Sequence, residues 1–234
     1  MTTALPVGFP QFHDEEWARQ PLGELALKYD TVENHGWYEN LEPTVHAIAH
    51  ELREGQVLVD YSGGTGILAD RLLRRIGTRE MGIVIVDASP KFLRLALEKL
   101  REDRRVAFRH IRYLKPQSRL MYLDEVIEEP LRSRGVDAIS STNAIHLYYD
   151  LEGTLSSWAR VLKPGAPCFV QSGNIGNPAA ASDEWIIDAT VESIHEAAME
   201  LVRGDARWTL FRPALGDAKR MAAHGALRAK VFLP

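Results

Sequence analysis

Cysteine is nearly absent from the sequence, which has a single one, Cys168, among 234 residues. One cysteine cannot form an internal disulfide, and zinc sites built on thiolates use several cysteines, so the sequence argues against both. Cys168 lies in the apolar run APCFV. Because a free cysteine behaves as a small apolar residue, we expect a buried structural thiol at this position.

An excess of positive charge is also lacking, since 28 lysine and arginine residues face 32 aspartate and glutamate residues and the net charge is −4. A basic stripe that binds a nucleic-acid backbone is not expected in such a chain. No apolar run approaches the roughly 20 residues that cross a bilayer. The first residues, MTTALPVGFPQFHDEEW, lack the charged-then-apolar pattern of a signal peptide. The sequence therefore predicts a cytoplasmic protein with no nucleic-acid and no membrane partner.

From residue 56 onward, short β-branched runs alternate with segments of helical period. This pattern predicts an α/β fold, in which helices cover a doubly wound, mostly parallel sheet. A helix is expected to begin at Pro90, with Ser89 as its N-terminal cap and Leu93 and Leu97 on its apolar face. The expected strands are 56–61, 82–87, 105–110, 136–141 and 167–172.

The first part of the chain, 1–54, is expected to form an N-terminal helical cap on a main domain over 55–234. Helices are predicted over 14–29 and 41–53, the second with apolar residues at helical spacing. Between them lies the turn-rich stretch KYDTVENHGWYEN. It is either a loop that contacts a ligand or a linker whose aromatic residues anchor it to the core.

The end of the sequence offers one apolar strand, LRAKVFLP, after a long helix predicted over 183–203. A single unpaired apolar strand is an unfavourable edge. Either the sequence is a piece of a longer protein, or a second subunit covers that edge in a homodimer. Truncation is the preferred interpretation.

A glycine-rich turn follows the first predicted strand in VLVDYSGGTG, residues 57–66. Such a turn lets the backbone approach a ligand, and the N–H groups of the following helix favour negative or polar groups. Residues 64–69, GTGILA, fit the dinucleotide pattern G-x-G-x-x-A, with Asp87 about 20 residues later. S-adenosylmethionine fits as well, because Asp60 and Asp87 supply acceptors for its ammonium group and its ribose hydroxyls. The turn alone leaves both cofactors open.

Three blocks in matching order and spacing resemble the class I S-adenosylmethionine-dependent methyltransferases, over about 57–171. The first is the glycine turn with its strand, and the second is VIVDASPKFLRLALEKL at 84–100. The third, at 136–171, includes the turn Leu-Lys-Pro-Gly at 162–165 and decides against the dinucleotide. The resemblance implies the class I methyltransferase fold, with S-adenosyl-L-methionine as cofactor and S-adenosyl-L-homocysteine as product.

The resemblance also implies the residues of the cofactor site. Asp60 takes the position of the acid in the first strand, and Asp87 that of the residue holding the ribose hydroxyls. The residues expected to contact the cofactor are Tyr29, Asp60, Ser62, Gly63, Gly64, Gly66, Asp87, Ala88, Ser89, Arg112 and Asn143.

Two positions depart from the family pattern. Ser62 stands where the first glycine is usual, which is tolerable if its backbone angles stay ordinary and its hydroxyl bonds the cofactor. Arg112 or Tyr113 aligns with the acid that accepts the adenine amino group in many members. Arginine cannot accept such a bond, so the adenine contact is expected from backbone or from stacking.

Candidate catalytic residues follow the fourth predicted strand. His146 is the preferred base, with a packing role near the cofactor as its alternative, and Tyr148 is a second candidate. Trp37 and Tyr38 are candidates for stacking on an acceptor or on adenine. His195 lies where the family closes over the acceptor, although a polar position on an amphipathic helix explains it as well. No metal is required for methyl transfer, and the acids at 124, 125, 128 and 129 are expected to form a charged helix face.

The expected function is methyl transfer to an oxygen, nitrogen or carbon atom of a small-molecule acceptor. The N-terminal helices and a lid over 173–204 would form the acceptor pocket. The alternative is a non-catalytic module of the same fold that binds S-adenosylmethionine or S-adenosylhomocysteine. A dinucleotide-dependent oxidoreductase is a second alternative, which the block at 136–171 disfavours.

Overall fold

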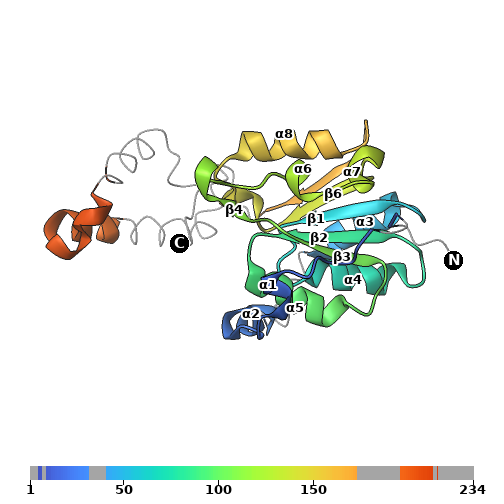
Figure 1. The fold of residues 1–234 in the computed structure, drawn as a ribbon, viewed down its shortest axis with the longest axis horizontal. Helices are drawn as coiled ribbons and strands as arrows, with labels where there is room; N and C mark the ends of the chain where they lie inside the picture. The colour runs from blue at the N-terminus through green and yellow to red at the C-terminus, as the bar shows by residue number, and fades with distance from the viewer. Residues whose placement is uncertain (1–4, 7–8, 32–40, 173–195, 213–214, 216–234) are drawn as a thin grey trace. The chain divides into compact units, whose positions relative to one another are not determined.

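A computed structural model describes residues 5–6, 9–31, 41–172, 196–212 and 215 of the chain. Five parallel strands form a sheet in the order β3-β2-β1-β6-β7 (Figure 1). All five predicted strands are confirmed, with ends that differ by no more than two residues. The strands are β1 (Val57–Tyr61), β2 (Gly82–Asp87), β3 (Val106–His110), β6 (Ala138–Thr142) and β7 (Cys168–Gln171).

Helices cover both faces of this sheet, which explains why β1 and β2 are buried along their whole length. The predicted doubly wound α/β fold is therefore confirmed. Ser89 caps the helix that begins at Pro90 by accepting a hydrogen bond from the Phe92 amide, as expected. One face carries α3 (Leu41–Glu51), α4 (Ile67–Ile76) and α5 (Pro90–Leu100), and the other carries α6 (Leu123–Val126), α7 (Leu131–Arg134) and α8 (Leu151–Val161) (Figure 1).

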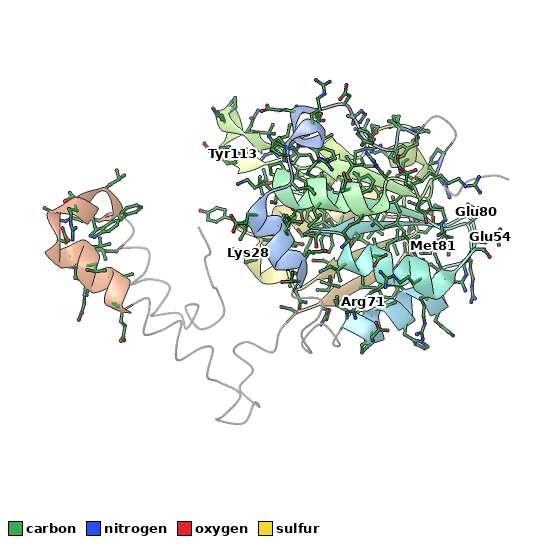
Figure 2. All side chains as sticks on the ribbon, turned by 90° about the horizontal axis from the view of Figure 1, so that it is seen from below. Lys28, Glu54, Arg71, Glu80, Met81 and Tyr113 are labelled. Atoms are coloured by element: carbon green, nitrogen blue, oxygen red, sulfur yellow. The ribbon has the colours of Figure 1, made fainter. Side chains whose placement is uncertain are left out.

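The strand order reverses beside β1, because the chain passes from β1 to β2 and β3 and then returns to β6 and β7 on the other side. Asp60 on β1 is in register with Ile85 on β2 and with Ser140 on β6. Open α/β sheets bind their ligands at the carboxyl ends of the strands, at such a reversal. Tyr113, which follows β3, lies at this end, opposite Glu54, which precedes β1 (Figure 2).

The outer edge of β3 is covered by residues 9–12. The Phe108 amide donates a hydrogen bond to the Gln11 carbonyl at 2.7 Å. Arg109, whose side chain is 2% exposed, donates to the same carbonyl at 3.2 Å and forms an ion pair with Glu128. An uncovered edge strand is a template for pairing with other chains, and this N-terminal segment removes that liability at β3.

The helix predicted over 14–29 is wrong, because two short helices occupy the segment: α1 (Glu16–Arg19) and α2 (Glu24–Asp30). Pro21 between them has no N–H to continue the first helix, and Gly23 adopts an extended conformation as the N-cap of the second. Both helices pack against α5. The second predicted helix is confirmed as α3.

The prediction of a buried thiol at Cys168 is also wrong, because the side chain is exposed. Phe169 packs against the hydrophobic core that contains α3, whereas Cys168 and Val170 point to the opposite face of β7. Among the described residues, none covers that face of this outermost strand enough to bury the two side chains.

The chain divides into two compact units, 1–171 and 172–234. The described part of the second unit is helical over 196–204 and continues into the 3₁₀ helix η6 (Ala206–Phe211). The boundary predicted at residue 54 and the main domain over 55–234 stay predictions. Within the described ranges, no helix is long and apolar enough to cross a bilayer.

Candidate functional site

The carboxyl end of β1 continues into a tight turn, residues 62–66, that leads into α4. The amides of Ser62 and Gly63 donate to the Val86 carbonyl of β2 at 2.7 and 3.2 Å, and the Gly66 amide donates to the Gly63 carbonyl at 2.9 Å. Gly66 has a φ of 78° directly before the first residue of α4. The turn is thus fixed to the neighbouring strand, and it brings the free amides of the helix start to the carboxyl end of the sheet.

Gly63 lies where no side chain fits. A Cβ atom at this position would be 2.6 Å from Asp60 Oδ2 and 2.9 Å from Ile85 Cγ2. The requirement for glycine is therefore steric, since the backbone of Gly63 passes directly over the Asp60 carboxylate.

Asp60 is fully buried beneath this turn. Its Oδ1 atom accepts a hydrogen bond from the Ser140 hydroxyl at 3.0 Å, but its Oδ2 atom has no partner among the described residues. Burial raises the pKa of Asp60 to about 7, against the hydrogen bond from Ser140, and the nearby Asp87 adds to the rise. A buried oxygen without a partner is unfavourable, so the site is incomplete without a donor or a positive group beside Asp60.

Thr65 supplies a second buried oxygen in the same turn. Its side chain is 1% exposed, and its Oγ1 atom has no hydrogen-bond partner within the described ranges. Two polar atoms without partners, on either side of Gly63, indicate a ligand with hydrogen-bonding groups.

Asp87 lies at the carboxyl end of β2, 7% exposed. Its Oδ2 accepts from the Gly64 amide at 2.8 Å, and its Oδ1 accepts from the Ser89 amide at 2.7 Å. Burial raises the pKa of this carboxyl, and hydrogen bonds from the backbone of Ser89, Gly64 and Ala88 oppose the rise. Each carboxylate oxygen has a further lone pair, so Asp87 can accept hydroxyl groups of a ligand while it holds the turn.

A cavity opens above the turn and brings predicted residues together from three parts of the chain. Tyr29 comes from α2 and stacks on Phe92 of α5, with 4.7 Å between the ring centroids. Asn143, at a φ of 54°, comes from the end of β6. The cavity is lined by Tyr29, Leu41, Ser62, Gly63, Gly64, Thr65, Ile67, Leu68, Thr142 and Asn143.

Ser62 has a left-handed backbone with a φ of 60°, so the condition that its backbone angles stay ordinary is not met. This conformation is unfavourable for a residue with a Cβ atom, by about 1–3 kcal/mol. The Tyr148 hydroxyl donates to Ser62 Oγ at 3.0 Å. The departure from glycine is thus accompanied by a specific hydrogen bond to the side chain.

Tyr148 is largely buried against Tyr61 and Trp158, with ring centroids 5.4 and 6.2 Å away. Burial raises the pKa of its hydroxyl well above the ordinary value, although Ser141 and Ser62 form hydrogen bonds with it. At neutral pH the group therefore acts as a hydrogen-bond donor. The backbone of His146 lies in the 3₁₀ helix η4 (Ile145–Leu147), directly before Tyr148.

Arg112 lies beyond β3 and lines a different cavity, of about 200 Å³, together with Trp17 and His110. The His110 imidazole bonds to the Ala88 backbone, and burial lowers the pKa of His110. Arg112 therefore does not share a described cavity with the glycine turn, and its contact with the cofactor stays a prediction. The predicted residues Trp37, Tyr38 and His195 lie outside the described residues.

Sequence reasoning missed two buried serines that form hydrogen bonds with Asp60 and Tyr148. Ser140 and Ser141 are fully buried within β6, where Ser140 bonds Asp60 and Ser141 bonds Tyr148. Two adjacent serines inside a buried strand were the available signal, because buried hydroxyls need partners. Thr65, between two glycines, gave no comparable signal.

Metal ligands do not gather in the part of the chain that the structure describes, where no three histidine, cysteine or acidic side chains are grouped. The acids at 124–129 do not form the single charged helix face that was expected, because α6 ends at Val126. Each pairs with an arginine: Asp124 with Arg160, Glu125 with Arg119, Glu128 with Arg109 and Glu129 with Arg132.

Comparison with known proteins identifies the segment that holds this site. Residues 59–168 match the family model described as a methyltransferase domain. The ubiquinone/menaquinone biosynthesis C-methyltransferase UbiE of Idiomarina loihiensis is 30% identical over 114 residues, 49% of this chain and 41% of that protein. The protein of the same name from Serratia proteamaculans is 29% identical over 119 residues, 51% of this chain and 43% of that protein. The match thus spans less than half the length of these relatives.

Among solved structures, the phosphoethanolamine N-methyltransferase 2 of Haemonchus contortus in complex with S-adenosyl-L-methionine is 20% identical. The match covers 86% of this chain and 47% of that one, with a TM-score of 0.49. At this score the likeness carries no further conclusion about the chain.

Proposed function

We propose that this chain is a class I S-adenosylmethionine-dependent methyltransferase that transfers a methyl group to a small-molecule acceptor, because residues 59–168 match a methyltransferase domain. The cofactor of this family is S-adenosyl-L-methionine, and its product is S-adenosyl-L-homocysteine. The acceptor atom is an oxygen, a nitrogen or a carbon. The curated relatives carry the name of a C-methyltransferase, which supports carbon among these.

One observation carries the proposal: the Oδ2 atom of the fully buried Asp60 has no hydrogen-bond partner among the residues that the structure describes, and it lies beneath a turn that admits only glycine at position 63. An ammonium group, such as that of the cofactor's methionine part, would satisfy this oxygen and offset the burial of the carboxylate. The hydroxyl of Thr65 and the amides at the start of α4 are suited to the carboxylate of the same ligand.

Asp87 would hold the ribose hydroxyls. Its carboxylate lies beside the turn, is fixed by two backbone amides and has lone pairs for further donors. Tyr29 and Asn143 line the cavity above the glycine turn and would contact the cofactor. The residues present therefore fit the group that the family uses.

The bound cofactor supplies an activated methyl group, and the protein's main contribution is to align an acceptor with it and to exclude water. We propose His146 as the base where the acceptor arrives protonated, since its backbone precedes Tyr148 at the carboxyl end of the sheet. Tyr148 itself is a poor base, because burial raises its pKa. Trp37, Tyr38, His195 and a lid over 173–204 stay candidates for acceptor binding.

A cytoplasmic location, the absence of a nucleic-acid partner and a homodimer in which the second subunit covers the predicted C-terminal strand belong to this proposal as well. The mixed charge of the chain supports the absence of a nucleic-acid partner. The exposed side chains of Cys168 and Val170 on β7 are consistent with a second subunit.

The proposal is tested by incubating the full chain with S-adenosyl-L-methionine and a panel of small acceptors and measuring the release of S-adenosyl-L-homocysteine. Turnover that requires an acceptor is expected, and it should be lost in Asp60→Ala and Asp87→Ala. Tight cofactor binding with no turnover on any acceptor would instead favour the non-catalytic binding module.

A further inference from the structure

Three hydroxyl groups form a chain that joins the glycine turn to β6. Tyr148 donates to Ser62 Oγ at 3.0 Å, and the Tyr148 and Ser141 hydroxyls lie 2.7 Å apart. A phenol has one proton, so Ser141 is the donor in the second bond. Ser141 is fully buried, which fixes the far end of the chain in the core of the sheet.

Tyr148 is itself held in place by packing. Its ring meets Tyr61 edge-to-face at 90°, and Trp158 lies nearly perpendicular to it at 82°. The residue ends the 3₁₀ helix η4 and bonds a turn that lies 86 residues earlier in the chain. The aromatic cluster thus orients a single hydroxyl toward Ser62.

Ser62 needs such support because it holds a left-handed backbone that glycine adopts without strain. Its amide and that of Gly63 bond Val86, and the next amide, of Gly64, bonds Asp87. A shift of Ser62 toward an ordinary φ would therefore disturb these three hydrogen bonds. Ser62, Gly63 and Gly64 all line the cavity, so such a shift would change its shape.

We propose that Tyr148 is a positioning residue, which holds Ser62 in its left-handed conformation and so keeps the glycine turn in the shape that binds the cofactor. This inference rests on the proposed function for the identity of the ligand. The shape of the turn itself can be followed without any ligand. Ser62, supported by the hydrogen bond from Tyr148, then adopts the conformation of the glycine that is usual at this position in the family.

The test is a double-mutant cycle with Tyr148→Phe and Ser62→Gly, read by calorimetry with S-adenosyl-L-homocysteine. Tyr148→Phe keeps the packed ring and removes two hydrogen bonds, so affinity should fall by about 5- to 20-fold. Ser62→Gly alone should bind at least as well as wild type, because glycine needs no support. The affinity of the double variant should be within about twofold of that of Ser62→Gly. If Tyr148→Phe acted through lost packing, it would lower the affinity in the Ser62→Gly background as well.

Tyr122→Phe is the matched control. It also removes a hydroxyl that donates a hydrogen bond, here to Asp150, but it has no bond to the turn. Its affinity should equal that of wild type. Three results would overturn the proposal. The first is an affinity of Tyr148→Phe within twofold of wild type. The second is that Tyr148→Phe lowers the affinity by the same factor in the wild-type protein and in the Ser62→Gly variant. The third is weaker binding by Ser62→Gly, since that result would place the hydroxyl on the cofactor.

Hydrogen exchange of the ligand-free protein separates this proposal from the proposed function. Tyr148→Phe should speed exchange of the amides of Ser62, Gly63 and Gly64 by about 5- to 20-fold, and Ser62→Gly should restore their protection. If wild type binds no S-adenosyl-L-homocysteine, the proposed function fails, whereas this exchange pattern would still support the positioning role. Unchanged exchange in Tyr148→Phe would contradict that role whatever the ligand.

Discussion

The Asp87 carboxylate accepts a hydrogen bond from the Gly64 amide at 2.8 Å. This bond connects the end of β2 to the turn after β1, and a second bond from the Ser89 amide fixes the other carboxylate oxygen at 2.7 Å. One side chain therefore shapes the turn and offers acceptor lone pairs to a ligand beside it. The binding and the architecture of the site depend on the same carboxylate.

Replacement of this carboxylate should abolish cofactor binding. Asp87→Ala removes charge-assisted hydrogen bonds worth about 1.5–3 kcal/mol each, so the affinity for S-adenosyl-L-homocysteine should fall by 10²-fold or more. Calorimetry measures the loss, and circular dichroism should show an intact fold. Asp14→Ala, which removes an exposed acid paired with Arg19, is the control and should bind normally. Wild-type affinity in Asp87→Ala would remove Asp87 from the site.

The titration of Asp60 should couple pH to stability and to binding. Its pKa is about 7 in the folded protein and 3.8 as an unperturbed group, so the folded state holds more protons than the unfolded state between these values. The stability contribution of Asp60 to the ligand-free protein therefore falls as pH rises through this range. Asp60→Asn should unfold at a higher temperature than wild type at about pH 8, with a smaller difference at about pH 5 and little difference below the unperturbed pKa of 3.8.

Cofactor affinity should follow the opposite trend, because the charged Asp60 attracts an ammonium group. Binding of S-adenosyl-L-homocysteine to wild type should strengthen as pH rises toward about 8, and binding to Asp60→Asn should be weaker and nearly independent of pH. Calorimetry over this range measures both. The same pH dependence in the two proteins would assign it to another group.

Substitution of Gly63 should be more damaging than substitution of Gly64. A Cβ at Gly63 would lie 2.6 Å from Asp60 Oδ2, whereas one at Gly64 meets no atom within 4 Å and suffers only from its φ of 56°. Gly63→Ala should lower stability by about 1–3 kcal/mol and abolish binding. Gly64→Ala should lower the free energy of unfolding by about 1–2 kcal/mol, through backbone strain alone.

Chemical denaturation gives these free energies, with Gly204→Ala as a control in open space and at an ordinary backbone angle. Equal effects of Gly63→Ala and Gly64→Ala would show that the contact with Asp60 is not the constraint.

Ser62→Gly should change stability less than Ser118→Gly. Both serines have left-handed backbones, with φ values of 60° and 52°, so glycine relieves strain at either position. Among the described residues, only the Ser62 hydroxyl of the two has a hydrogen bond to lose, the one from Tyr148, and its loss offsets about 1 kcal/mol of the gain in stability. Ser118→Gly should therefore raise the melting temperature by more. The reverse order would indicate that the Tyr148 bond contributes nothing to the fold.

The centre of the sheet was predictable from the sequence because β1 and β2 are buried along their whole length and are rich in β-branched residues, as VLVDY and GIVIVD show. The break between α1 and α2 was missed because helical periodicity was given more weight than Pro21 and Gly23. Exposure of Cys168 was not predictable, since it depends on which face of β7 the helices leave open.

For the site, Asp60 and Asp87 came from their spacing within family blocks, and the structure places both beside the turn. The role of Tyr148 could not be predicted, because its bond to Ser62 joins residues far apart in the chain. Backbone angles such as the φ of Ser62 follow from tertiary contacts that one sequence does not display.

The central claim, that the turn after β1 binds S-adenosyl-L-methionine, is tested most directly by calorimetry of the full chain with three ligands in turn. S-adenosyl-L-methionine and S-adenosyl-L-homocysteine should each bind at one site, and NAD should not bind. Binding of NAD alone would contradict the account.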